Sequence, residues 1–583
     1  MLVLACGPFL VYYPYMASII GKKRGEATYY YLAESARVGG KPRIVSQEYL
    51  GTAEELAAAM RGGGLGLPGR VRHKDFGAAA AAWGVLEDLG VAAIIDEVTG
   101  ARRSGAGASA GTYLVLAALN RVVAPCSKLA FADWWAKTAA PRFTRIPATV
   151  LDHRRFRDAM RAVRLADLEE ISRRIAVAIT GTFGLDCSSV ALDMTNFATF
   201  IATANGKAPI AQRGKAKQKR SDLRLVGLGL VVTRDGGIPL TWHACPGDRP
   251  DVTQSPEMIS QLRRRYQAVT AAAGHPPSQD MTVVFDAGQN SGDNFAHLAR
   301  AGLHYAGSVP ASDCGDLTAL PASRRAIADK DRFGGLTAYD TRRQVYGAAR
   351  RCILTHSPEY HDSQAAGFDG TTLAKAGKKP DELTATLARG KTRRPRDKVE
   401  TEIASIIAKP WVRRVVTWQL SGDQAKDLRL TWSIDQDARA ALEEELFGKH
   451  VLITDHDDWP VAEVIAGYRS QSEAEFSFRQ LKDRRVVSFS PMHHWTEHNI
   501  TVHMFTCVLA LQIAHLMRLK ARRGGLDLSV RTLLAELAGI SETILLYPGD
   551  RGRPKAHRML TDTTPVQNKL AKIFALDRYA PRR

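Results

Sequence analysis

The sequence has few cysteines, and none of them forms a C-x-x-C pair. Seven cysteines are scattered through 583 residues. This odd, dispersed set argues against a disulfide framework and a structural zinc site, and it favours a reducing compartment. Two other signatures are missing as well. The Gly-rich stretch from Gly62 to Gly69 lacks the Gly-Lys-Ser/Thr ending of a P-loop, and no H-E-x-x-H pattern marks a metalloprotease.

Long hydrophobic runs are also scarce. The apolar opening of the chain has its first lysine at Lys22, so it lacks the basic start of a signal peptide. The stretch from Met504 to Met517 is apolar over 14 residues but contains Gln512 and His515. This stretch is too short and too polar to span a bilayer, so we expect a buried helix and no membrane segment.

What the sequence has in excess is positive charge. Lys and Arg total 80 against 60 Asp and Glu, which gives a net charge of +20 at pH 7. Such an excess suits a polyanionic partner. Composition alone leaves both nucleic acid and an acidic membrane surface open.

The N-terminal third changes from a strand pattern to a helix pattern. Two β-prone runs flank Gly39-Gly40 and predict a hairpin, with Arg37, Lys41 and Arg43 near its tip. From about 75 to 184, five segments carry apolar residues at three- and four-residue spacing and predict an all-α domain. The basic run 154–157 fits either a helix lying on DNA or a solvated face.

From about residue 188 the pattern becomes that of strands, with a helix near 255–274, and predicts a mixed α/β sheet. A polycationic loop interrupts it at 213–220; the basic residues assigned to it are Lys215, Lys217, Lys219 and Arg220. Strand-like pieces alternate with polar, basic loops over 300–455, which we interpret as a β-rich insertion. Beyond 460 the helix pattern returns, and the chain ends in a basic tail.

Two of the predicted strands end with a carboxylate. Asp193 follows Val190-Ala191-Leu192, and Asp286 follows Val283-Val284-Phe285. A charge is tolerated in a buried sheet only where the strand leaves the core, and in open α/β sheets the carboxyl ends of strands form the ligand crevice. Either aspartate alone is more often a turn or cap residue. Their pairing favours a site.

A third carboxylate falls on a predicted helix between Trp459 and Arg484. At 100° per residue one stripe, 80° wide, collects Tyr468, Gln471, Glu475, Arg479 and Lys482. Phe476 and Leu481 point away from it, toward the expected core. Alone, the stripe could be an ion-paired surface in which Glu475 supports Arg479.

Together, two strand-end aspartates and a helix glutamate match the needs of phosphoryl transfer. Two divalent ions about 3.5–4 Å apart activate the attacking oxygen and stabilise the leaving one. Such hard ions take oxygen ligands, hence carboxylates rather than Cys or His. Lys482 and Arg479 would then hold phosphates of the DNA strand.

These residues resemble a known family. The order Asp193, Asp286, Glu475 and the signature Tyr468-x2-Gln471-x3-Glu475-x6-Lys482 are similar to the YREK-type DDE transposases of bacterial insertion sequences. The resemblance runs through most of the chain, in YYYLAESARVGGKPRIVSQEYLG, LDMTNFATF, TRDGGIPLTWHACPGDRPDVTQ, VFDAGQNS, FSFRQLKD and HHWTEHNITVHMF.

The resemblance implies an RNase H-like catalytic core and cut-and-paste transposition, with cleavage at terminal inverted repeats and transfer to target DNA. Asp193, Asp286 and Glu475 would bind two Mg²⁺ or Mn²⁺ ions, and Tyr468 and Lys482 would contact the transposon end. Gln471 stands where the signature has arginine, and Arg469 or Arg479 could supply the missing charge. Two other hypotheses stay open: an RNase H-like nuclease without strand transfer, and a catalytically dead DNA-binding regulator.

The resemblance also completes the expected organisation, an α+β or α/β multidomain protein. The expected parts are an upstream extension (1–15), a hairpin segment (16–62), a helical DNA-binding domain (70–184), the first part of the catalytic core (185–300), a β-rich insertion (301–455), the second part of the core (456–520) and a basic helical tail (521–583). We expect a bacterial cytoplasmic protein associated with the nucleoid, bound to double-stranded DNA as at least a dimer, with no membrane partner.

Overall fold

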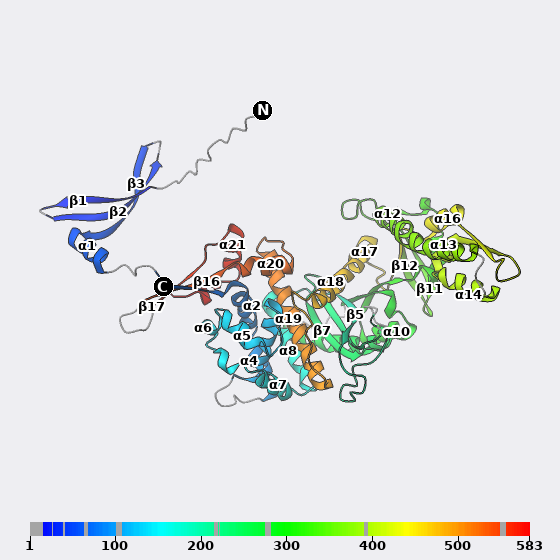
Figure 1. Cartoon of the computed structure of the whole chain (residues 1–583), viewed down its shortest axis with the longest axis horizontal. Coiled ribbons are helices and arrows are strands. Elements are labelled where there is room, and N and C mark those ends of the chain that lie inside the picture. The colour runs from blue at the N-terminus through cyan, green and yellow to red at the C-terminus, as the bar shows by residue number, and fades with distance from the viewer. Residues whose placement is uncertain are drawn as a thin grey trace. The chain divides into compact units, whose positions relative to one another are not determined.

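The computed structural model divides into two compact units (Figure 1). It describes residues 16–25, 27–38, 41–62, 68–100, 108–214, 220, 222–273, 281–389, 394–548 and 555–582. One unit comprises Met1–Lys74, Glu542–Thr561 and Pro581–Arg583, and the other comprises Asp75–Ser541 and Asp562–Ala580. The expected extension at 1–15 and the loop residues Lys215, Lys217 and Lys219 lie outside the described residues.

The first unit contains two small three-stranded sheets. Strands β1 (Met16–Arg24), β2 (Ala27–Val38) and β3 (Lys41–Thr52) form one sheet, followed by helix α1 (Ala53–Gly62). The predicted hairpin is the β2–β3 pair, in which Val38 is aligned with Lys41. The other sheet joins β4 (Arg70–Asp75) to β16 (Ser541–Tyr547) and β17 (Lys555–Leu560). The region 521–583 is therefore not the wholly helical tail that we predicted.

Among the described residues, seven helices of the larger unit precede the large sheet, and each of the five predicted helical segments contains one. They are α2 (Gly77–Asp88), α3 (Val91–Thr99), α4 (Ala110–Val123), α5 (Phe131–Lys137), α6 (Ala140–Thr144), α7 (His153–Ala162) and α8 (Asp167–Phe183). They belong to the same compact unit as the large sheet, so we do not describe them as a separate domain.

Helix α19 (Glu497–Arg523) is the buried centre of the larger unit. Nearly every residue from Ile500 to Leu519 is buried, as predicted for 504–517, but the helix is longer than we expected. By length and composition it could cross a membrane, as could the bent pair α2–α3 if counted as one span, among the described residues. However, 94% of the apolar window of α19 is buried inside the protein. Two of its polar side chains contact backbone carbonyls: Gln512 Nε2 donates to Pro239 O, and His515 Nδ1 lies 2.7 Å from Gly237 O.

A nine-stranded mixed sheet forms the rest of the core, in the order β10-β11-β12-β15-β9-β8-β5-β6-β7. The strands are β5 (Ser189–Thr199), β6 (Arg224–Thr233), β7 (Pro239–Pro246), β8 (Thr282–Phe285), β9 (His304–Val309), β10 (Ala326–Ile327), β11 (Thr337–Val345), β12 (Ala348–His356) and β15 (Lys449–Thr454). Strands β5, β8 and β9 run parallel, connected through α9 (Asp251–Ala272) and α10 (Gly292–Ala301), and every other neighbouring pair is antiparallel. The protein is thus a mixed α/β protein with a large mixed sheet.

The region predicted as a β-rich insertion, 301–455, needs correction. Strands β9, β11, β12 and β15 belong to the large sheet, and the segment between β12 and β15 is mainly helical. It contains α12 (Pro358–Gly367), α13 (Ala374–Ala388), α14 (Arg396–Ile406), α15 (Pro410–Val415) and α16 (Gln436–Leu446) around the two-stranded β13 (Val416–Ser421) and β14 (Arg429–Ile434). Two hydrophobic clusters of its own hold this insertion together.

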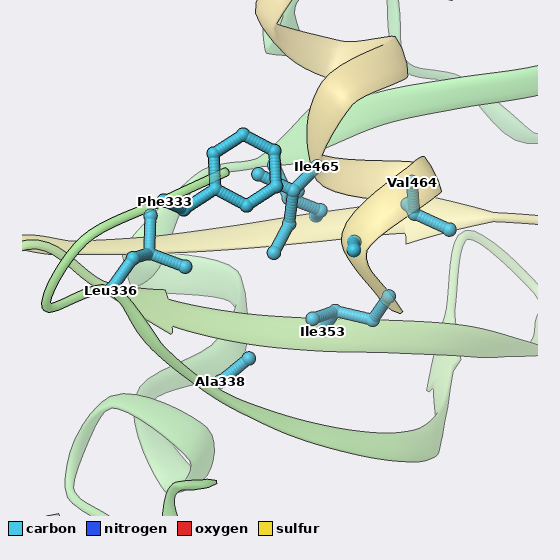
Figure 2. Close-up of a cluster of buried hydrophobic side chains, with 8 residues drawn as sticks. Phe333, Leu336, Ala338, Ile353, Val464 and Ile465 are labelled. Carbon is cyan, nitrogen blue, oxygen red and sulfur yellow. The ribbon is translucent and has the colours of Figure 1, made fainter. Parts of the chain in front are cut away.

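Helix α17 (Val461–Arg469) is held on the outer strands of the sheet. Figure 2 shows Val464 and Ile465 of this helix above Ile353 of β12, beside Phe333. Val464 and Ile353 are fully buried and Ile465 is 2% exposed, so this contact is part of the core. Because α17 leads directly into the next helix, its packing against the sheet also fixes the position at which that helix begins.

Candidate active site

Asp193 and Asp286 emerge side by side from two neighbouring parallel strands. Leu192 of β5 is aligned with Phe285 of β8, and both side chains are buried. The two aspartates occupy the next position on each chain. Neighbouring strands lie about 4.8 Å apart, so the two carboxylates lie close together at the carboxyl end of β8. Asp286 ends its strand as predicted, but β5 continues to Thr199, so Asp193 does not end its strand as we expected.

The Asp286 carboxylate is oriented by a short hydrogen-bond chain. Its Oδ1 accepts from the backbone N–H of Ala287 at 2.7 Å and from the Ser308 hydroxyl of β9 at 2.8 Å. The Tyr468 side chain hydrogen-bonds the same serine. Burial, followed by the nearby charges of Asp286 and Glu475, raises the pKa of Tyr468. The phenol is therefore a neutral group that helps to position Asp286 through Ser308.

The predicted single helix over 459–484 is two helices. Helix α17 ends at Arg469 and α18 (Gln471–Lys482) begins after Ser470. The Ser470 hydroxyl donates to the backbone carbonyl of Gly467 at 2.6 Å, an alternative to regular helix bonding that serine often adopts. The break turns Gln471 inward at the start of α18.

Helix α18 is tied to β5 on both sides of Asp193. Gln471 Nε2 donates to the carbonyl of Leu192 at 3.0 Å, and Lys482 Nζ donates to Thr195 Oγ1 at 2.7 Å. Glu475 lies on the same stripe of the helix, one turn after Gln471. The two tethers therefore direct Glu475 toward the edge that carries Asp193.

The buried position of Gln471 corrects the prediction that it contacts DNA. Gln471 is only 7% exposed, and its side chain joins helix α18 to strand β5. Phe476 also differs from expectation: it is only partly buried and stacks on His515 of α19, whereas Leu481 is buried as predicted.

The basic residues of the site differ in their surroundings. Arg479 and Glu475 are both exposed, and within the described ranges they form no ion pair with each other, which argues against a merely ion-paired surface. Arg469 stacks over Phe333 at 4.6 Å, on the side of the outer strands. Arg220 forms a two-bond ion pair with Asp222, so a DNA contact there would have to compete with that pair.

The three carboxylates have the chemistry of a site for hard divalent ions. Asp286 uses Oδ1 for both of its recorded hydrogen bonds, and Glu475 makes no hydrogen bond or ion pair with any residue that the structure describes. The ligand atoms of the three residues are not all within 4.8 Å of one another. Carboxylate oxygens are the ligands that such ions prefer.

Among the described residues, three other side chains have ligand atoms that all lie within 4.8 Å of one another: His304, Asp455 and His456. His456 Nε2 lies 2.7 Å from Thr282 Oγ1, at the start of β8, whereas Asp286 follows the end of that strand. The two imidazole rings are stacked on each other with centroids 4.4 Å apart. This group is separate from the three carboxylates.

Sequence reasoning missed two residues that shape the site. Thr195 could have been found, because it lies two residues after Asp193 and thus on the same face of β5. No pattern in the sequence indicates Ser308, because its role depends on the pairing of β8 with β9. Both act by positioning: Thr195 holds Lys482, and Ser308 holds Asp286.

No protein-family model and no curated protein matches the sequence. Among solved structures, this one is similar to the synaptic complex of piggyBac transposase with hairpin DNA, with a TM-score of 0.34 and 8% identity. The similarity covers 79% of this chain and 78% of that chain. At this level it does not establish a shared function, which the residues of the site have to support.

Proposed function

We propose that the protein is a DNA transposase that cuts the ends of a mobile element and joins them to target DNA. The observation that carries this proposal is the double tether of α18 to β5. Gln471 and Lys482 bond to residues on either side of Asp193, and Glu475 lies between them on the same helix stripe. Carboxylates from two strands and one helix thereby face one edge of the sheet.

The strand arrangement supports an RNase H-like core. Strands β5, β6 and β7 form an antiparallel meander, and β8 and β9 lie parallel to β5 on its other side. Asp193 lies on the first strand of this set and Asp286 follows its parallel neighbour.

Asp193, Asp286 and Glu475 would hold two Mg²⁺ or Mn²⁺ ions. When bound, such ions supply the charge that activates an attacking oxygen and stabilises a leaving oxygen. The chain's own contribution is to hold the three carboxylates and to orient the DNA. Ser308 orients Asp286, and Lys482, held by Thr195, places a cation beside the first strand for a DNA phosphate.

The charge of the chain supports DNA as the partner. A net charge of +20 favours binding along a polyanion, with an affinity that falls steeply as salt rises. Two element ends have to be brought together for transfer, so the working form on DNA is at least a dimer.

The test is a joining assay with DNA taken from either side of the gene. Purified protein, Mg²⁺, labelled flanking fragments and a supercoiled plasmid should yield cut ends and then labelled plasmid. Cut ends without joined plasmid would favour the nuclease alternative. DNA binding without any cut would favour the regulator.

A further inference from the structure

A small cavity between α4, α7 and the segment that follows α18 is lined mainly by basic and imidazole side chains. It has a volume of about 290 Å³ and nine lining residues, none of them Asp or Glu. Six carry arginine, lysine or histidine side chains: Arg121, Lys128, His153, Arg157, His493 and His494. Donors of this kind around one small space suit an anionic group.

Arg121 of α4 ties the cavity to the segment that follows α18. It is 4% exposed, and its guanidinium donates to the backbone carbonyls of Ser488, Ser490 and Pro491 at 3.2, 2.9 and 2.9 Å. All three partners are neutral. The positive charge of this buried group is therefore hydrogen-bonded but not neutralised.

Lys128 adds a second, partly buried cation. Its Nζ lies 3.1 Å from Nε2 of His494. Burial, reinforced by Arg121 and Arg157, lowers the pKa of Lys128 to about 8, and burial with the same cations and Lys128 lowers the pKa of His494 to about 2. The imidazole is thus a neutral acceptor at pH 7, and the lysine ammonium keeps further N–H donors.

Carboxylates do not balance these charges. The charged groups that act on Lys128 are Arg121 and Arg157, together with the thiols of Cys126 and Cys507. Arg157 of α7 has no ion pair in the described part of the chain, and Asp152, 3.6 Å from His153, does not line the cavity. Gathering cations in a partly buried site without a counter-charge costs free energy, which a bound anion offsets.

We propose that this cavity binds a phosphate group of the DNA backbone. Arginine, lysine and histidine donors around one small space are the groups that recognise phosphate. This inference rests on the proposed function for the identity of the polyanion, and it adds a contact apart from the three carboxylates.

Strand β5 leads from Asp193 toward the segment that Arg121 holds. On β5, Asp193, Thr195 and Phe197 share one face, and Phe197 stacks on Phe489 with ring centroids 4.3 Å apart. Phe489 lies between Ser488 and Ser490, whose carbonyls accept from Arg121.

The test compares two arginines of α7 in the full-length protein. Both are exposed, but Arg157 lines the cavity and Arg155 does not. Binding of a flanking duplex is measured by fluorescence anisotropy between 50 and 200 mM salt without divalent metal. Loss of one phosphate contact reduces the slope of log affinity against log salt by about 0.9. Between 50 and 200 mM salt, the loss of affinity of Arg157→Gln should therefore be about 3.5-fold smaller than that of the unchanged protein.

Lys128→Gln should behave like Arg157→Gln, and Arg155→Gln like the unchanged protein. Wild-type slopes in both cavity variants, or an equal change in Arg155→Gln, would overturn the proposal. Stabilisation by inorganic phosphate that both cavity variants lose, with DNA binding unchanged, would identify a free-phosphate site and also overturn it. Because this experiment measures DNA binding and not cleavage, its result can be interpreted even if the protein proves to have no transposase activity.

Discussion

Replacing Gln471 with methionine should uncouple Glu475 from Asp193 without unfolding the protein. Methionine has a similar length, but it cannot donate to the Leu192 carbonyl that Gln471 reaches at 3.0 Å. The substitution therefore removes the tether at the start of α18 while the Lys482–Thr195 bond at the other end remains.

The magnitudes separate stability from activity. A neutral intramolecular hydrogen bond contributes about 1 kcal/mol net, a small part of the roughly 5–15 kcal/mol that stabilises a folded domain. Gln471→Met should thus stay folded. A displacement of about 1 Å in a catalytic group can cost about 100-fold in rate, so we expect cleavage to fall at least about tenfold.

Gln480→Met is the matched control. Gln480 is on the same helix, but in the described structure its Oε1 has no hydrogen-bond partner. Cleavage of flanking DNA and urea unfolding are measured for both variants. Full cleavage by Gln471→Met, or an equal loss in Gln480→Met, would refute the tether.

Three further predictions follow from individual contacts. Ser308→Ala removes the hydroxyl that donates to Asp286, so cleavage should fall about tenfold while DNA affinity is unchanged; equal cleavage rates would contradict this positioning role. Ile465→Ala should lower the free energy of unfolding by about 2–5 kcal/mol because the side chain is buried against the sheet, and a loss below 1 kcal/mol in urea titrations would contradict the packing (Figure 2). Burial lowers the pKa of His515 from near 6.5 to about 4, so the unfolded chain takes up its proton first as pH falls. This difference of about 2.5 pH units removes about 3 kcal/mol of stability between pH 6.5 and 4, and His515→Asn should flatten that slope; an unchanged slope would refute the assignment.

The two aspartates could be predicted from sequence because each follows an apolar run, although only Asp286 ends its strand and β5 continues past Asp193 to Thr199. That pattern depends on local order alone, and the structure has Asp193 within β5 and Asp286 directly after β8. The stripe on α18 could also be predicted, because the spacing of Glu475 and Lys482 in the sequence puts them on the same side of a helix.

Features that depend on tertiary contacts could not be predicted. The break at Ser470 carries no proline or glycine, so helical periodicity ran through it. The insertion between β12 and β15 alternates short apolar pieces, and short runs of that kind do not distinguish strand from buried helix. The inward turn of Gln471 depends on a carbonyl 279 positions earlier in the chain.

The most direct test of the central claim is metal-dependent cleavage by carboxylate variants. Asp193→Asn, Asp286→Asn and Glu475→Gln keep side-chain size but remove a negative charge from the set that would hold the ions. With flanking DNA and Mg²⁺ or Mn²⁺, each should lose cleavage at least about 1000-fold while binding DNA within about threefold of the unchanged protein. Full cleavage by all three variants, or cleavage by the unchanged protein in excess EDTA, would contradict the account.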